Sequence, residues 1–197
     1  MKKLSILTAT LLSGALVLTA CSKTQSNSSE QNNSSSSSSS SSNSTEEKKT
    51  RQAFDFSSMD KDGNTVKLSD YKGKKVYINV WASWCGPCVR EMPELEKAYQ
   101  KLKDKEDVVF LSITSPSDDV FKNQSPQDKD KATILAKAKE LGVTYPVLFD
   151  VNDRFLVNYT IRSFPTHIFI NSDGTISNQI SGALTESALE EEISKIK

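Results

Sequence analysis

The sequence contains very few of the residues from which disulfide frameworks and metal sites are built. Its 197 residues include three cysteines and one histidine. A small protein held together by disulfides needs more cysteines than this, and a zinc site needs about four cysteine or histidine ligands. Cys21 lies far along the chain from the other two, so Cys85 and Cys88 remain as an isolated pair of thiols.

The sequence also lacks an excess of charge of either sign. Lysine and arginine together number 25, and aspartate and glutamate together also number 25. A chain with no net charge has no overall basic field that would attract nucleic acid, and it shows no acidic tail. We therefore expect no nucleic acid among the partners of this protein.

The apolar run near the start, Leu4 to Leu18, is too short to span a membrane comfortably, because a spanning helix takes about 20 residues. It follows a short basic stretch and ends in Leu18-Thr19-Ala20-Cys21, which resembles a bacterial lipobox. The resemblance implies that residues 1–20 are a lipoprotein signal peptide. It also implies that a lipid on Cys21 anchors the chain to the outer face of the cell membrane. An ordinary signal peptide followed by a chance cysteine is the alternative.

Residues 21–50 lack hydrophobic periodicity. They are rich in serine, asparagine, glutamine and threonine, with an unbroken serine run from Ser34 to Ser42. Such a stretch cannot bury a core, so we expect a disordered tether, and a long polar tether after a lipobox is typical of Gram-positive surfaces. Residues 51–197 have the length of a normal single domain.

The pair of thiols lies where a predicted strand meets a predicted helix. An apolar run from Val76 to Trp81 comes before it, and a helical pattern starts directly after Cys85. A helix N-terminus carries about half a positive elementary charge and unpaired N–H groups, which stabilise a thiolate. The pKa of a cysteine there can fall from about 8.5 to about 7 or lower, which makes it a nucleophile at neutral pH. Pro87 is tolerated in the first turn, and Gly86 leaves room for the backbone of another protein.

The motif Trp84-Cys85-Gly86-Pro87-Cys88 resembles the active site of thioredoxins. The longer frame from Asn79 to Pro93 resembles more closely the membrane-tethered, extracytoplasmic branch typified by ResA and TlpA, and the resemblance extends from about Phe54 to the C-terminus. It implies an α/β, thioredoxin-like fold, with a mixed central sheet flanked by helices and an N-terminal β-hairpin. It also implies an enzyme, a thiol–disulfide oxidoreductase that needs no cofactor or metal.

A second stretch resembles another part of the same fold. Phe164-Pro165 matches the thioredoxin-fold loop in which a cis-proline lies opposite the two thiols. The resemblance implies that this loop pairs with the main chain of a client protein while the proline packs against the sulfurs. It therefore assigns catalysis to Cys85 and Cys88, and a supporting or client-binding role to Trp84, Gly86, Pro87, Phe164 and Pro165.

Three further residues near these motifs are open to interpretation. Asn79 stands where cytoplasmic thioredoxins carry a buried aspartate, and an amide cannot act as a general base. Glu91 could aid proton transfer to or from Cys88, or it could be a solvated helix glutamate. His167, the only histidine, is expected to be structural.

Hydrophobic patterns predict the remaining elements. The predicted strands are Phe54–Phe56, Thr65–Leu68, Val108–Ile113, Tyr145–Asp150, His167–Ile170 and Thr175–Ile180. The predicted helices run from after Cys85 to about Lys103 with a kink at Pro93, from Asp130 to Leu141, from Asp153 to Tyr159, and from Thr185 to Lys197. The polar stretch Thr114–Lys129 is predicted to be an irregular insertion. Alternation of strands and helices favours a mixed sheet covered on both faces.

The functional hypothesis is a monomeric reductase of client protein disulfides. The resemblance implies clients such as surface methionine sulfoxide reductase or apocytochrome c, and recharging by a membrane protein of the CcdA/DsbD type. The Gly-Pro dipeptide favours this direction, because it accompanies reducing thioredoxins near about −270 mV, whereas strong oxidants lie near about −120 mV.

Other functions are open at this point. The same fold could act as an oxidase that introduces disulfides into exported proteins. It could be a thioredoxin-fold copper chaperone if His167 joined the two cysteines. A zinc-binding module lacks the necessary ligands. A solute-binding lipoprotein would need a larger domain.

Overall fold

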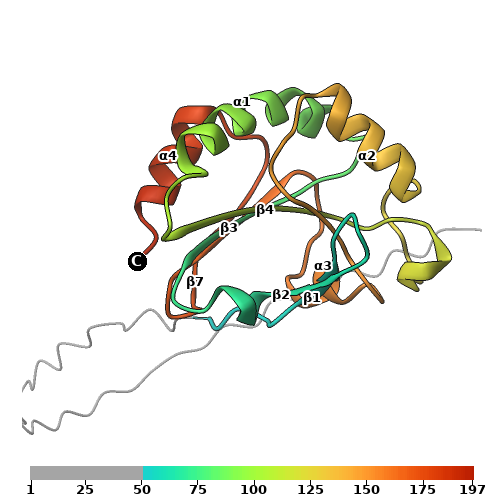
Figure 1. Cartoon of the computed structure of the whole chain (residues 1–197), viewed down its shortest axis with the longest axis horizontal. Coiled ribbons are helices and arrows are strands. Elements are labelled where there is room, and N and C mark those ends of the chain that lie inside the picture. The colour runs from blue at the N-terminus through green and yellow to red at the C-terminus, as the bar shows by residue number, and fades with distance from the viewer. Residues whose placement is uncertain (1–50) are drawn as a thin grey trace, which may run out of the picture. The chain divides into compact units, whose positions relative to one another are not determined.

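The computed structural model describes residues 51–197, shown in Figure 1. The expected signal peptide over residues 1–20, the lipid-bearing Cys21 and the expected tether up to residue 50 lie outside the described residues. Within 51–197, no helix is long and apolar enough to cross a membrane.

Strands and helices alternate along the described residues. The strands are β1 (Ser57–Met59), β2 (Thr65–Lys67), β3 (Lys75–Val80), β4 (Val108–Thr114), β5 (Val147–Phe149), β6 (Thr166–Ile170) and β7 (Ile176–Ser181). The α-helices are α1 (Gly86–Leu102), α2 (Lys131–Glu140), α3 (Arg154–Asn158) and α4 (Glu186–Ser194). Two short 3₁₀ helices are η1 (Leu68–Tyr71) and η2 (Asp119–Phe121). The predicted central elements are confirmed to within a few residues at each end.

The strands form one mixed sheet in the order β2-β1-β5-β4-β3-β6-β7. The central strands β3, β4 and β5 are parallel, β6 pairs antiparallel with β3, and β1 pairs antiparallel with β5. Helices α1, α2 and α4 cover one face and α3 lies on the other (Figure 1). The expected architecture, a mixed sheet flanked by helices with an N-terminal hairpin, is confirmed.

The central strand β3 shows why two cores form. Side chains alternate between the faces of a strand, so Tyr77 joins the core under α1 and α4, whereas Val76 and Ile78 join the core beside α3. All three side chains are buried. A strand whose two faces are both apolar is buried on both sides, so β3 lies inside the sheet, between β4 and β6. The loop after β3 therefore starts at the carboxyl ends of the parallel strands.

Helix α1 begins directly at the pair of cysteines. Cys85 is its N-cap residue, Pro87 lies in its first turn, and the helix continues through Pro93 as far as Leu102. Its inner face buries Met92 and further apolar residues at helical spacing. The predicted helix is therefore confirmed.

The N-terminal hairpin is confirmed, but its first strand starts three residues later than predicted, at Ser57 instead of Phe54. In the turn after β1, the carboxylate of Asp60 accepts hydrogen bonds from the backbone N–H groups of Asp62 and Asn64. These bonds close the turn and fix the pairing of Met59 with Thr65.

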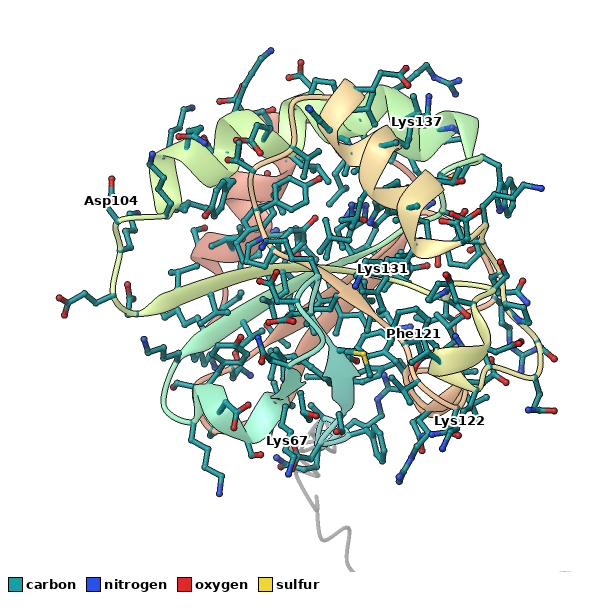
Figure 2. The ribbon with its side chains drawn as sticks, turned by 45° about the vertical axis from the view of Figure 1, so that its right-hand side comes forward. Lys67, Asp104, Phe121, Lys122, Lys131 and Lys137 are labelled. Carbon is teal, nitrogen blue, oxygen red and sulfur yellow. A yellow bond between two sulfur atoms is a disulfide. The ribbon has the colours of Figure 1, made fainter. Side chains whose placement is uncertain are left out.

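The stretch between β4 and α2 is more ordered in its packing than its polar sequence predicts. It contains η2, whose Phe121 is fully buried and lies 5.4 Å from the ring of Phe149, centroid to centroid. The next residue, Lys122, is exposed (Figure 2). The amide of Asn123 donates hydrogen bonds to the carbonyls of Pro116 and Asp150. We call residues 115–129 the β4–α2 segment. The predicted irregular insertion over Thr114–Lys129 agrees with the structure except at Thr114, which ends β4, and at η2, and Phe121 packs the segment against the core.

Candidate active site

Cys85 and Cys88 form a disulfide at the junction of β3 and α1, with their Cα atoms 5.3 Å apart. The backbone N–H of Cys88 points at the sulfur of Cys85, with a nitrogen-to-sulfur distance of 3.3 Å. This N–H is one of the first-turn donors that has no partner within the helix. The hydrogen bond and the positive end of the helix both favour negative charge on the Cys85 sulfur once the disulfide is reduced.

The two cysteines differ in their access to solvent. Cys85 is 3% exposed and Cys88 is 0% exposed. Next to them, Trp84 is 60% exposed, and Gly86 and Pro87 are also exposed. The surface around the disulfide is therefore formed by these three neighbours, and Cys85 is the sulfur nearer to it.

The loop before β6 lies beside the pair. The Phe164–Pro165 peptide bond is cis, as the resemblance to the thioredoxin-fold loop implies. The ring of Phe164 meets the ring of Trp84 edge to face, with centroids 6.1 Å apart. The carbonyl of Pro165 accepts a hydrogen bond of 2.9 Å from the N–H of Gly182. The structure thus brings Trp84 and the proline loop together, as expected for one continuous site.

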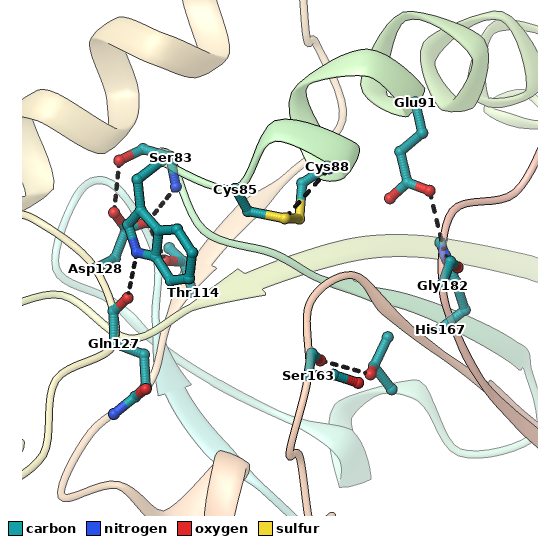
Figure 3. Close-up of a disulfide and its surroundings, with 12 residues drawn as sticks. Ser83, Cys85, Cys88, Glu91, Thr114, Gln127, Asp128, Ser163, His167 and Gly182 are labelled. Carbon is teal, nitrogen blue, oxygen red and sulfur yellow. Dashed lines mark hydrogen bonds and ion pairs between the residues drawn. A yellow bond between two sulfur atoms is a disulfide. The ribbon is translucent and has the colours of Figure 1, made fainter.

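A buried carboxylate that the sequence did not reveal holds the loop before Cys85. Asp128, in the β4–α2 segment, accepts hydrogen bonds from the N–H and the hydroxyl of Ser83, at 2.7 and 2.5 Å (Figure 3). It also accepts one from the hydroxyl of Thr114, at 2.9 Å. The carbonyl of Gln127 accepts a hydrogen bond of 2.7 Å from the indole N–H of Trp84. The β4–α2 segment therefore fixes both Ser83 and Trp84.

Glu91 is buried, at 3% exposure, so its interpretation as a solvated helix glutamate was wrong. One carboxylate oxygen, Oε2, accepts a hydrogen bond of 2.9 Å from the N–H of Leu184 and lies 3.4 Å from Nε2 of His167 (Figure 3). The other oxygen, Oε1, has no hydrogen-bond partner among the described residues. Glu91 follows Cys88 by three positions on the same buried face of α1.

His167 connects Glu91 to Tyr77 in the interior. Its Nε2 faces two acceptors, the carboxylate of Glu91 and the carbonyl of Gly182 at 3.1 Å. That nitrogen therefore carries the hydrogen, and Nδ1 accepts the hydroxyl hydrogen of Tyr77, at 2.8 Å. Burial, together with the charge of Glu91, raises the pKa of Tyr77 well above its usual value, so the phenol keeps its proton. The expectation that His167 is structural agrees with this network.

Two further observations concern the possible base for Cys88 and the copper-chaperone alternative. Asn79 is completely buried in β3, and its uncharged amide cannot accept a proton as a base would. In the part of the chain that the structure describes, no group of three or more histidine, cysteine, aspartate or glutamate side chains is arranged to hold a metal ion. Since both nitrogens of His167 are engaged elsewhere, the structure gives no support to a copper site that includes it.

Comparison with known proteins identifies the family. The profile of the Redoxin family matches residues 46–194. The chain belongs to the Redoxin family. This redoxin is 32% identical over 143 residues to the thiol–disulfide oxidoreductase ResA of Geobacillus kaustophilus, covering 73% of this chain and 75% of that one. It is 33% identical over 143 residues to the thioredoxin-like protein YneN of Bacillus subtilis, covering 73% and 77%.

A solved structure agrees with these relatives. The crystal structure of the pneumococcal exposed lipoprotein thioredoxin Etrx1 from Streptococcus pneumoniae matches with a TM-score of 0.56 and 30% identity. The match covers 73% of this redoxin and 100% of that chain. This redoxin is thus an enzyme, a thiol–disulfide oxidoreductase of the ResA type with a thioredoxin-like fold.

Proposed function

We propose that this redoxin is a surface-exposed, membrane-anchored reductase of disulfides in client proteins. The observation that carries the proposal is the hydrogen bond from the N–H of Cys88 to the sulfur of Cys85 at the start of α1. It favours the thiolate form of the cysteine nearer to the surface. A thiolate in that position is the nucleophile of thiol–disulfide exchange.

The proposed reaction has two exchange steps. The thiolate of Cys85 attacks one sulfur of the client disulfide, forms a mixed disulfide and releases the other client sulfur as a thiolate. Cys88 then loses its proton and attacks the sulfur of Cys85, which releases the second client thiolate and leaves Cys85–Cys88 oxidised. Two electrons pass to the client, and the released thiolates take up two protons. No cofactor is required.

We assign to Glu91 the role of accepting the proton of Cys88 in the second step. It is buried on the same face of α1 as Cys88, three positions further on. Its Oε1 has no hydrogen-bond partner in the described part of the chain, so this oxygen is available to accept a proton. Trp84, Gly86, Pro87 and Phe164 form the surface that receives the client, and the buried Pro165 supports it.

The first part of the sequence supports the proposed location, and the resemblance to the ResA-like branch supports the proposed partners. In this proposal, a lipid on Cys21 holds the chain at the outer face of the membrane and residues 21–50 let the domain reach its clients. Its structural relative Etrx1, an exposed lipoprotein thioredoxin of Streptococcus pneumoniae, supports this arrangement. Clients such as methionine sulfoxide reductase or apocytochrome c receive the electrons, and a membrane protein of the CcdA/DsbD type restores them. The Gly-Pro dipeptide favours this direction over that of a disulfide-forming oxidase.

Trapping of the mixed disulfide tests the proposal in cells. Cys88→Ser cannot complete the second step, so the variant is expected to accumulate covalent complexes with client proteins at the cell surface. Non-reducing electrophoresis followed by mass spectrometry would identify them. Cys85→Ser is the matched control, with no complexes expected. Equal trapping by both variants, or by neither, would contradict the assignment of Cys85 as nucleophile.

A further inference from the structure

The single histidine of the chain lies between the active-site helix and the central sheet. His167 is completely buried in β6, where it pairs with Asn79 of β3. Its diagonal neighbour on β3 is Tyr77, whose ring stacks on the imidazole with the ring centroids 6.0 Å apart. Both side chains lie on the face of the sheet that α1 covers, and Glu91 projects from α1 toward His167 (Figure 3).

The two carboxylate oxygens of Glu91 have different surroundings. Oε2 accepts the hydrogen bond from the N–H of Leu184 and lies 3.4 Å from Nε2 of His167. Oε1 is buried and has no hydrogen-bond partner within residues 51–197. Because donors face Oε2 and none faces Oε1 there, Oε1 is the oxygen that can take up a proton from Cys88.

The imidazole is held in one orientation from both sides. The hydroxyl of Tyr77 donates to Nδ1, whereas Nε2 faces two acceptors, the carbonyl of Gly182 and the carboxylate of Glu91. One donor on one side and two acceptors on the other favour the tautomer with its hydrogen on Nε2. The N–H dipole of Nε2 therefore lies beside Oε2 and stabilises negative charge on it.

The other titratable groups around Glu91 do not compete for the proton of Cys88. Tyr77 from β3 and Tyr145 from the stretch before β5 are both buried, and burial together with the charge of Glu91 raises the pKa of each phenol. Both phenols therefore keep their own protons. The loop before α4 contributes a backbone donor, the N–H of Leu184. Glu91 is thus the group on this side of α1 that can accept the proton.

We propose that His167 is a positioning residue for the second exchange step, in which Cys88 attacks the mixed disulfide. Its Nε2–H stabilises the anionic form of Glu91 at Oε2 and leaves Oε1 to accept the proton of Cys88. The sulfur of Cys88 then bonds to the sulfur of Cys85, the bond from Cys85 to the client breaks, and the electron pair leaves with the client thiolate. The inference rests on the proposed function, because it presupposes that Glu91 accepts this proton.

Oxidation by glutathione disulfide separates the two exchange steps. The protein is the full chain with Cys21→Ser, reduced beforehand, so that its only thiols are Cys85 and Cys88. At low concentrations of oxidised glutathione, the rate rises in proportion to concentration and measures the attack by Cys85. At high concentrations it reaches a plateau, which is set by the attack of Cys88 on the glutathione mixed disulfide. Acid quenching and mass spectrometry follow the mixed disulfide and the oxidised pair.

Two amide substitutions of His167 form the matched test. In His167→Asn the amide keeps an acceptor for the Tyr77 hydroxyl but is too short to reach Oε2 of Glu91. In His167→Gln the longer amide reaches the place of Nε2 and keeps a donor for Oε2. We expect His167→Asn to raise the pH at which the plateau is half-maximal by about one unit, because a buried carboxylate that loses a donor favours its neutral form.

Below that pH, the plateau of His167→Asn is therefore expected to be about tenfold lower than that of the wild type. His167→Gln is expected to restore the wild-type pH dependence. The slope at low glutathione concentration should stay within about twofold in both variants, because the attack by Cys85 does not involve Glu91.

Phe169→Leu controls for the loss of packing alone. Phe169 is buried two positions further along β6, and its ring centroid lies 5.3 Å from that of Tyr77. It has no polar group to offer Glu91, so this variant is expected to lower the urea midpoint of unfolding and to leave the pH dependence of the plateau unchanged. If His167→Asn behaved in the same way, the role of His167 would be structural only and the inference would be overturned.

A measurement on the unsubstituted histidine decides the case in which His167→Asn does not fold. Nitrogen NMR of the histidine-labelled full chain shows which ring nitrogen carries the hydrogen, and the single histidine makes the assignment direct. A hydrogen on Nε2 of His167 is the expected result. A hydrogen on Nδ1 alone would overturn the inference, because no donor would then face Glu91 from the ring.

Glu91→Gln separates the inference from the function on which it rests. An amide cannot accept the proton of Cys88, so the plateau is expected to fall about tenfold or more at every pH while the slope is unchanged. A lower plateau in Glu91→Gln without a shifted pH dependence in His167→Asn would overturn the inference alone. An unchanged plateau in Glu91→Gln, or no reaction of the reduced pair with oxidised glutathione, would overturn the proposed function and the inference with it.

Discussion

Replacing Cys85 by serine is expected to reduce the rate of protein disulfide reduction by about three orders of magnitude or more. The hydroxyl of serine has no anionic form at neutral pH comparable to a thiolate, and loss of a nucleophile costs factors of this size. Cys88 cannot take its place, because its side chain is completely buried below the surface. The loss is measured by single-turnover reduction of insulin disulfides, with the pre-reduced protein as the only source of electrons.

Cys88→Ser is the control for this first prediction. It retains the nucleophile, so it is expected to form a mixed disulfide with insulin in one rapid step and then to stop. Separation of the products by mass spectrometry shows which cysteine carries the client. A mixed disulfide on Cys88 in the Cys85→Ser variant would contradict the prediction, because it would make Cys88 the nucleophile that attacks the client.

Replacing His167 by alanine is expected to lower the free energy of unfolding by about 3 kcal/mol or more. The substitution leaves the buried carboxylate of Glu91 with the N–H of Leu184 as its remaining partner and removes the acceptor of the Tyr77 hydroxyl. Buried polar groups that lose a partner cost about 1–3 kcal/mol each, and a buried charge that loses its partner costs more. Urea unfolding followed by tryptophan fluorescence measures the change.

Two further variants test whether the loss of stability comes from the interaction of His167 with Glu91. Asp130→Ala removes only the side-chain cap of α2, where Asp130 accepts a hydrogen bond from the N–H of Thr133, and is expected to cost about 1 kcal/mol. In Glu91→Gln the buried charge is absent. Adding His167→Ala to that background should then cost less than it does alone, because the two residues interact. Additive losses would show that the pair is not coupled.

The parts of the site that could be predicted are those encoded by consecutive residues. The apolar strand, the two cysteines and the helix that follows them are neighbours in the sequence, so spacing alone places Cys85 at a helix N-terminus. The cis bond at Pro165 followed from resemblance, because propensity alone disfavours it.

The contacts of Asp128 could not be predicted, because they join distant parts of the chain. Asp128 bonds to Ser83 across 45 positions, and a single aspartate in a polar stretch carries no signal of burial. The alternation of Phe54-Asp55-Phe56 predicted a strand, but these residues precede β1, and Phe56 is buried in the core outside the strand.

Glu91 is a different case, because a signal was present in the sequence. It follows Cys88 by three positions and precedes Leu95 by four, which places it on the buried face of α1. The charge of glutamate favours a solvated position, but the helical spacing from Cys88 and Leu95 favours burial, and the prediction from spacing is the correct one.

The reduction potential of the Cys85–Cys88 pair tests the central claim most directly. Equilibration in glutathione or dithiothreitol buffers gives this potential, and the fluorescence of the exposed Trp84 beside the disulfide is the reporter. If the protein is a reductase supplied with electrons from the membrane, the potential is about −250 mV or lower. A potential above about −150 mV would contradict the account and indicate a protein that introduces disulfides.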